Sequence, residues 1–226
     1  MTERRDGTSG ANHGGGTEAT DGADLPVPAA VVNDDRWKLI ETDEASFGDE
    51  RLVTVRSRRA LYGDRRLRDR VQAATGHDRL WRSVFVARLA AEPSLTAGIA
   101  DLVVRSIAFP RARSRFRDDL AGRGFEAVEE VERRRIPVGD DGARAARLSA
   151  VIPVDDGGTA SAGAGTGDAG EVTVDAWVAL WDRETEMVAA GGFYPVGGLS
   201  GAPDAFDSVG AYREHLFEFV REVSAQ

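Results

Sequence analysis

The chain has 226 residues, a formal net charge of −9 and no Cys, and its 29 cationic residues are all Arg except Lys38. Without Cys, disulfide frameworks, thiolate metal sites and lipid-anchored cysteines are excluded. No apolar run approaches the ~18 residues of a membrane-spanning helix, and the N-terminal residues hold no apolar stretch typical of a secretory signal. The composition therefore predicts a cytoplasmic protein without a membrane partner.

The chain begins with an acidic, Gly-rich segment at residues 1–34. This segment carries too few apolar groups to offset the entropy of ordering, so we expect a disordered tail. Residues 35–226 are expected to form a single domain. Within that domain, the Gly, Ala and Asp residues of 155–170 are expected to form a flexible loop at the tip of a hairpin.

Alternating apolar residues predict seven strands in the domain. In chain order they are residues 37–40, 51–62, 80–90, 125–136, 144–154, 171–182 and 185–196. The segment VTVDAWVALW has the clearest pattern, with Val172, Val174 and Val178 opposite Trp177 and Trp181.

Three helices are expected between and after these strands. Asp64 caps one that ends at about Thr75, Pro110 begins another, and Ser208 caps the last. The last helix has the cleanest amphipathic pattern in the chain. Runs of consecutive strands favour antiparallel pairing, because parallel pairs need long crossovers. The expected fold class is α+β, a twisted antiparallel sheet with helices packed mainly on one face.

The charged residues indicate where the protein works. An excess of Asp and Glu keeps a surface hydrated, and Arg supplies planar, weakly hydrated cations. This combination predicts a protein of a halophilic archaeon that works in concentrated salt. The alternative is a GC-rich genome, in which Arg codons replace Lys codons without selection. Residues 51–135 hold 20 Arg and 11 anions, and both flanking parts of the chain are acidic.

This Arg-rich middle is the candidate binding surface. Basic side chains gathered on strands and on the first helix can bind anions or nucleic acid. The expected anion-binding residues are Arg56, Arg58, Arg65, Arg66, Arg68, Arg70, Arg82 and Arg88. The alternative is that these Arg pair with the surplus carboxylates. In molar salt the Debye length is about 3 Å, which weakens any binding of nucleic acid by charge alone.

Motifs for catalysis, cofactors or metals are weak. Gly165, Gly167 and Gly170 have the spacing of a dinucleotide-binding loop, but a strand follows instead of the helix that would hold the pyrophosphate. His215 and Glu218 are three residues apart on the last helix and could face one metal, although such a pair is typical of solvated surface. No G-x-S-x-G elbow presents a nucleophile. We expect no cofactor, metal site or catalytic residue.

Several segments together resemble an uncharacterised haloarchaeal protein family. They are RWKLIETDE, VRSRRALYGDRRLRDRVQAATG, WRSVFVARL, FRDDLAGRGFEAVE, VDAWVALW and AAGGFYPVGGL, within about residues 36 to 224. The resemblance implies habitat and single-domain organisation, but no activity or site residues. The expected arrangement of helices on a sheet also resembles the PsbP-like fold, whose members mostly act as binding or accessory proteins.

The leading hypothesis is a non-enzymatic binding or accessory domain whose partner is a protein or a small molecule. Two alternatives stay open. One is nucleic-acid or anion binding through residues 51–135, and the other is an enzyme with an unrecognised carboxylate site.

Overall fold

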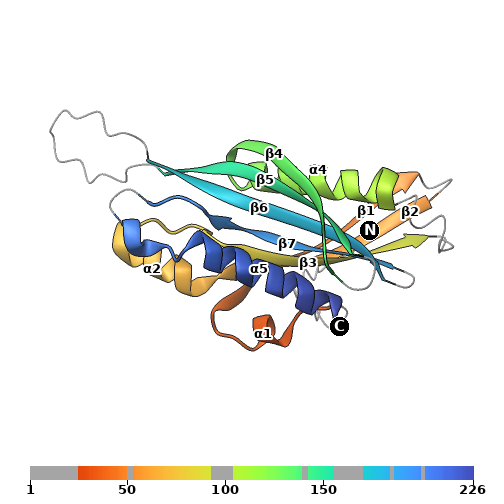
Figure 1. The fold of residues 1–226 in the computed structure, drawn as a ribbon, viewed down its shortest axis with the longest axis horizontal. Coiled ribbons are helices and arrows are strands. Elements are labelled where there is room, and N and C mark those ends of the chain that lie inside the picture. The colour runs from red at the N-terminus through yellow and green to blue at the C-terminus, as the bar shows by residue number, and fades with distance from the viewer. Residues whose placement is uncertain are drawn as a thin grey trace, which may run out of the picture.

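The computed structural model describes residues 25–49, 53–92, 104–138, 142–154, 170–183, 186–199 and 202–226. Seven strands in these ranges form one antiparallel sheet (Figure 1). They are β1 (Trp37–Asp49), β2 (Val53–Asp64), β3 (Ser83–Glu92), β4 (Glu126–Ile136), β5 (Ala143–Val154), β6 (Gly170–Arg183) and β7 (Glu186–Pro195). The sequence predicted a strand at each place, although β1 continues to Asp49 instead of ending at Ile40.

Two meanders make up the sheet. The strand order is β1-β2-β3-β7-β6-β5-β4, so β1 to β3 form one meander, β4 to β7 form the other, and β3 pairs with β7. Charged residues support the register of the first hairpin, because Asp43 lies opposite Arg59 and Glu44 lies opposite Arg58. Opposite charges at facing positions stabilise a ladder.

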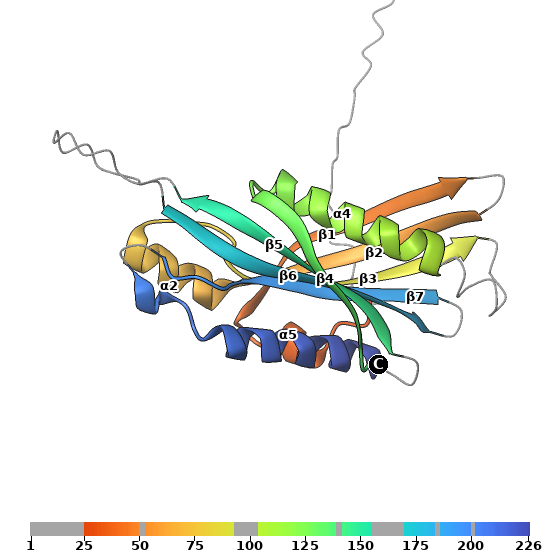
Figure 2. The ribbon, with the colours of Figure 1, turned by 45° about the horizontal axis from the view of Figure 1, so that its top comes forward.

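Three longer helices cover the sheet on two faces. They are α2 (Arg65–Thr75), α4 (Phe109–Gly122) and α5 (Val209–Ser224). Helix α4 lies on one side of the sheet, and α2 and α5 lie on the other (Figures 1 and 2). Phe116 of α4 lies 5.2 Å from Phe85, whereas Phe217 of α5 lies 5.0 Å from Trp177, measured between ring centroids. The ladder places Phe85 on the same face as Val178, and the adjacent Trp177 points to the opposite face.

The expected fold class is therefore wrong. The sheet dominates the structure, and α2, α4 and α5 lie on both of its faces instead of packing mainly on one. The physical reason lies in the central strands. In β6, Val174 and Val178 on one face and Trp177 and Trp181 on the other are all buried. A strand that is apolar on both faces needs a cover on each side, and α4 and α5 provide these covers.

Glycines let the central strands approach each other closely. A Cβ atom at Gly191 of β7 would lie 1.9 Å from the carbonyl oxygen of Trp177 and 2.9 Å from the Phe85 ring. At Gly192 it would lie 2.0 Å from the carbonyl oxygen of Ser83. Any side chain at these positions would separate β7 from its two neighbours.

Part of the segment expected to be a disordered tail belongs to the fold. The short helix α1 (Ala29–Val32) precedes β1, and both Leu25 and Val31 are buried in the core. Residues 1–24 and residues 155–169 of the expected loop lie outside the described residues. Gly170, the last residue of that expected loop, is the first residue of β6.

A buried carboxylate joins the start of α2 to the sheet. Asp64 caps the helix by accepting a hydrogen bond from the backbone N–H of Leu67 at 3.0 Å. It also accepts hydrogen bonds from Nε of Arg36 at 2.8 Å and from Nη1 of Arg82 at 3.1 Å. The Asp64 side chain has no exposed surface, so one buried anion serves two cations and a helix terminus.

Arg82 is the buried cation of this cluster. Its side chain is 2% exposed, and its guanidinium lies 5.0 Å from the ring centroid of Trp37 and 4.9 Å from that of Tyr212. Burial and repulsion from Arg36 lower the pKa of Arg82, whereas Asp64 opposes that shift. The guanidinium of Arg82, which directly precedes β3, therefore contacts β1 and α5 through their rings and Asp64 through charge.

Candidate functional site

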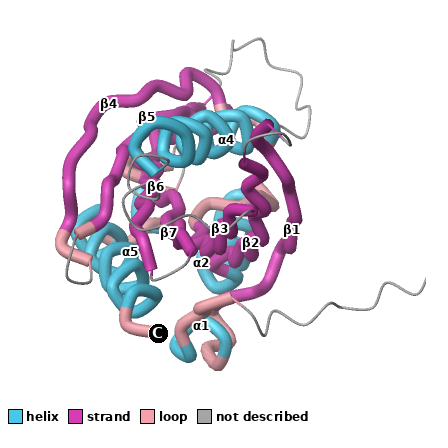
Figure 3. The backbone as a smooth tube through the Cα atoms, turned by 90° about the vertical axis from the view of Figure 1, so that its right-hand side faces the viewer, coloured by secondary structure: helices cyan, strands magenta, loops and turns pink. Residues whose placement is uncertain are grey.

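A cavity of about 280 Å³ lies between α4 and the sheet. Its floor consists of Phe85, Ala87, Leu89, Val178 and Ala189 from β3, β6 and β7. Ala87 and Ala189 lie directly opposite each other in the ladder, so two small side chains leave space beneath the helix. Figure 3, viewed along the sheet, shows α4 lying over this face between the β1 side and the β5 side.

The roof of the cavity is α4, which follows a five-residue π-helix (Val104–Ala108). Pro110 lies in the first turn, where a missing N–H needs no partner. Phe116 and Leu120 are buried beneath the helix, and Phe116 also lines the cavity. The helix therefore packs through apolar side chains on one stripe and leaves a hollow where the facing strands carry alanine.

An ion-pair network closes the β1 and β2 side of the cavity. It uses Arg115 and Asp119 of α4, Arg123 directly after this helix, and Glu41, Asp43 and Arg59 of the strands. Arg115 and Asp119 are four residues apart and share one stripe of α4, and Arg123 continues this spacing at the C-cap. Arg59 pairs with Asp119, and Arg115 Nη2 lies 3.2 Å from Asp43 Oδ2. These charges neutralise one another and hold the helix over the cavity.

The opposite flank of α4 is tied to β4. Arg113 donates a hydrogen bond to Glu130, and Arg133 donates another to the same carboxylate. Burial alone would raise the pKa of Glu130, but the hydrogen bonds from Arg133 and Arg113 hold this pKa below its ordinary value. Ion pairs therefore fix the roof on both flanks above an apolar floor.

The lining of the cavity favours a particular ligand chemistry. Its charged residues are Asp43, Arg59, Arg111, Arg115, Asp118 and Asp119, whose formal charges cancel. Arg111, Arg115 and Asp118 are exposed, whereas Phe85, Leu89 and Val178 at the floor are buried. The polar groups thus surround the mouth, and the interior offers apolar contact.

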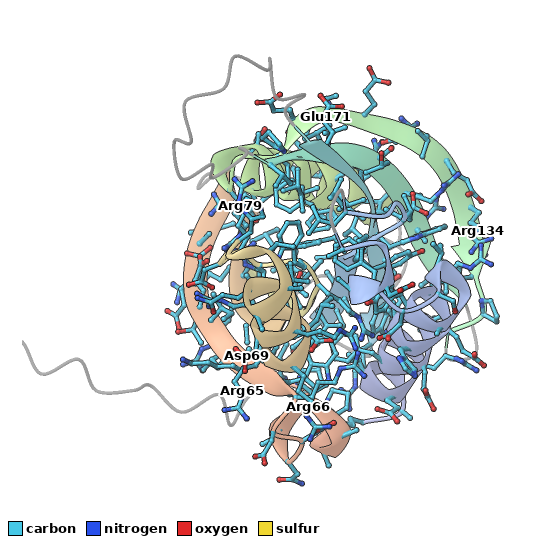
Figure 4. All side chains as sticks on the ribbon, turned by 90° about the vertical axis from the view of Figure 1, so that its left-hand side faces the viewer. Arg65, Arg66, Asp69, Arg79, Arg134 and Glu171 are labelled. Carbon is cyan, nitrogen blue, oxygen red and sulfur yellow. The ribbon has the colours of Figure 1, made fainter. Side chains whose placement is uncertain are left out.

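Four of the anion-binding residues predicted from the sequence lie on α2. They are Arg65, Arg66, Arg68 and Arg70. Arg68 Nη2 donates to Asp78 Oδ2 at 2.8 Å, and this pairing lowers the pKa of Asp78. Arg66 lies 3.5 Å from Asp34, and Arg70 lies 3.3 Å from Asp207. Figure 4 shows Arg65 and Arg66 at the outside of the molecule beside α2.

The other four predicted residues lie on or next to β2 and β3. They are Arg56, Arg58, Arg82 and Arg88. Arg58 lies 3.0 Å from Glu44, Arg88 lies 2.7 Å from Glu186, and Arg82 is buried against Asp64. Arg56 lies eight residues before the end of β2, where α2 begins. At about 3.3 Å per residue, it is about 26 Å along the strand from the Arg residues of α2. The structure therefore spreads the eight residues over two ends of the sheet and its interior, and anion binding by them stays a prediction.

Two further findings concern the described ranges of the chain. There, no three His, Asp or Glu side chains gather closely enough to hold a metal ion. Within the same ranges, no helix has both the length and the apolar character needed to cross a membrane.

Fold and cavity together define a sheet protein in which one helix roofs a small hollow. The model of a family described as a domain of unknown function (DUF6517) matches residues 24–224, so the chain belongs to that family. Neither a curated protein nor a solved structure matches the chain. The family agrees with the expected one in having no known activity. These comparisons support neither the expected haloarchaeal origin nor the expected likeness to PsbP-like domains.

Proposed function

We propose that this protein is a non-enzymatic binding domain that holds a small, mainly apolar ligand between α4 and the sheet. The observation that carries the proposal is the hollow beneath α4, where Ala87 and Ala189 face a helix that is held in place by ion pairs. The carboxylates on the flanks of the roof support a structural role. Asp119 and Asp43 pair with Arg59 and Arg115, and these pairs occupy groups that an acid–base mechanism would use.

The ligand is expected to be compact and without net charge. The cavity volume of about 280 Å³ lies near the lower end of the range for small-molecule sites. Because the charges of the lining residues cancel, a charged ligand would gain little net attraction from them. An apolar body in the cavity gains from removal of apolar surface from water, a term that strong salt does not screen.

A pair of fluorescent probes tests this proposal. N-phenyl-1-naphthylamine is neutral, and 8-anilino-1-naphthalenesulfonate has nearly the same rings with one anionic group. Both are titrated into the protein in 3 M KCl. The neutral probe should bind with the higher affinity. Ala87→Leu should weaken that binding at least ~10-fold, about 1.4 kcal/mol, because the added carbons occupy the cavity.

Ala90→Leu is the matched control, because Ala90 lies three residues along the same strand and is exposed. It should leave the affinity of the neutral probe unchanged. Equal effects of the two substitutions, or no binding by the parent protein, would rule out the cavity as the binding site.

We also propose that the protein works in the salt-rich cytoplasm of a halophile. The support is the acidic net charge of −9, together with cationic residues that are nearly all Arg. Below roughly 0.5 M KCl, repulsion between carboxylates should weaken the fold, since the Debye length lengthens from about 3 Å in molar salt to about 10 Å at 0.1 M. The melting temperature should fall as KCl is lowered from 3 M to 0.2 M. A melting temperature independent of KCl would contradict this habitat.

A further inference from the structure

A second hollow, of about 300 Å³, lies where the end of β4 meets α5. Its charged lining residues are Arg134, Arg135 and Arg221, and the other four are apolar, Phe217 among them. It lies on the α5 side of the sheet, so it is separate from the cavity under α4 and does not depend on the function proposed there. Figure 4 shows Arg134 on β4, on the other side of this view from Arg65.

Ring contacts hold the Arg134 guanidinium in place. Its central carbon lies 4.7 Å from the ring centroid of Trp177 and 5.4 Å from that of Phe217. A guanidinium that stacks on a ring keeps its N–H donors in its own plane, where they stay available to an acceptor. These two ring contacts therefore restrict the Arg134 side chain without using its N–H donors.

Arg221 is also held through one part of its side chain. Its Nε donates to the carbonyl oxygen of Phe217 at 3.1 Å, one turn earlier on α5. This contact leaves the two terminal nitrogens of Arg221 to other acceptors. Two positioned guanidinium groups, those of Arg134 and Arg221, therefore border the hollow, and the exposed Arg135 is the third cation among its lining residues.

The charge balance of this hollow is unusual for the molecule. The chain has 38 Asp and Glu against 29 Lys and Arg, yet within the described part of the chain no carboxylate is among the residues that line the hollow. Glu132 is the acid paired with Arg134, and its oxygen lies 3.6 Å from Arg134 Nε, which is too far for a hydrogen bond. The same carboxylate lies 3.3 Å from Arg147. Arg147 also lies 3.2 Å from Asp175, so Glu132 remains the acid near Arg134, but at 3.6 Å it forms no hydrogen bond with the Arg134 Nε.

We propose that this hollow binds an oxyanion group, a carboxylate or a phosphate, of a small ligand. Guanidinium groups bind such oxygens through paired, charge-assisted hydrogen bonds. The anion would accept hydrogen bonds from Arg134 and Arg221, and the apolar lining would contact the adjoining part of the ligand. The sequence-predicted anion residues on α2 lack this arrangement, because Arg66, Arg68 and Arg70 each pair with an aspartate.

Thermal unfolding with inorganic phosphate or acetate at equal ionic strength in 1 M KCl tests the site. A ligand that binds only the folded protein raises the melting temperature, and the rise grows with the logarithm of the ligand concentration relative to its Kd. Phosphate also stabilises proteins without binding, so the measured quantity is the difference between the parent and the variant R134Q/R135Q/R221Q. The parent should bind at least one of the two anions at least ~10-fold more tightly than this variant, as expected for charged hydrogen bonds.

Two controls make the result specific. Arg65→Gln removes one exposed Arg on α2. The two anions should raise its melting temperature as much as they raise that of the parent protein. If loss of the Arg134 stack destabilises the triple variant, R135Q/R221Q keeps the stack and should still bind the anion less tightly than the parent. The proposal would be overturned if both anions raised the melting temperatures of the parent and the variants equally. It would also be overturned if Arg65→Gln lost as much anion binding as the triple variant. A stronger response to phosphate than to acetate would assign the site to phosphate esters, and the reverse would assign it to carboxylic acids.

Discussion

Removal of the Asp64 carboxylate should strongly reduce the free energy of unfolding. Asp64→Ala leaves the Arg82 guanidinium, 2% exposed, without its anion and deprives α2 of its cap. Breaking a buried ion pair costs about 3–5 kcal/mol, and loss of a helix cap costs about 1 kcal/mol. The expected loss is therefore about 4–6 kcal/mol, which is a large part of the ~5–15 kcal/mol that stabilises a typical domain.

Two further variants separate these contributions. Asp64→Asn keeps an oxygen that can accept from Leu67, so it should lose only the ionic part, about 3–5 kcal/mol. In the double variant D64A/R82M, no buried cation is left without a partner, so the combined loss should be smaller than the sum of the two single losses. This difference, the coupling free energy between the two substitutions, is expected only if Asp64 and Arg82 stabilise the fold as a pair.

Urea unfolding at a fixed 3 M KCl, followed by tryptophan fluorescence, measures these losses, because urea leaves the ionic strength unchanged. Asp69→Ala is the matched control, since Asp69 is an exposed acid on the same helix, and it should change stability by less than ~0.5 kcal/mol. A loss below ~2 kcal/mol in Asp64→Ala would refute the reasoning. Strict additivity in the double variant would refute it as well.

The remaining predictions concern the roof and the central strands. Because the pKa of Glu130 is lowered in the folded protein, its contribution to stability is present above about pH 4.3 and is lost as the pH falls below that value. Glu130→Gln should therefore flatten the acid limb of the stability profile measured by thermal unfolding between pH 7 and pH 3, and an unchanged acid limb would contradict this role. Gly191→Ala should destabilise the fold by more than ~2 kcal/mol, because its Cβ would lie 1.9 Å from a backbone oxygen of β6. Gly197→Ala, where the nearest atom would be 3.8 Å away, is its control in urea unfolding.

The elements of this fold are readable from the sequence, because local patterns determine them. Alternation predicted the strands, and the cap residues Asp64 and Ser208 predicted the starts of α2 and α5, where both accept a backbone hydrogen bond. Long-range arrangement was not readable in the same way. Pairing of β3 with β7 depends on contacts between segments far apart in the chain, to which local periodicity is blind.

A signal for helices on both faces was nevertheless present. A strand with one solvated face alternates apolar and polar residues, but β6 places valines on one face and tryptophans on the other. The two sets were correctly predicted to lie on opposite faces, but the expected fold provided a cover mainly for one of them. Apolar residues on both faces indicate a strand that is covered twice.

The two candidate sites were missed for different reasons. The α4 cavity arises where Ala87 faces Ala189 across a ladder, and an alanine in a strand gives no sign of the space beside it. The proposed oxyanion site gives no comparable signal, because Arg is most crowded in the sequence of α2, where Arg66, Arg68 and Arg70 each pair with an aspartate. Arg134 and Arg221 become a site only when β4 meets α5, a contact that no local pattern predicts.

The ladder between β3 and β7 has a consequence for how the chain assembles. It joins Leu89 to Met187, about a hundred residues away, and closing so long a loop costs entropy before the contacts form. The two meanders are built from neighbouring hairpins and can form earlier. Until they meet, β3 and β7 are both open edges that can pair with other chains. When β3 of one molecule takes β7 of another, the product is a domain-swapped dimer, the misassembly that this topology favours at high protein concentration.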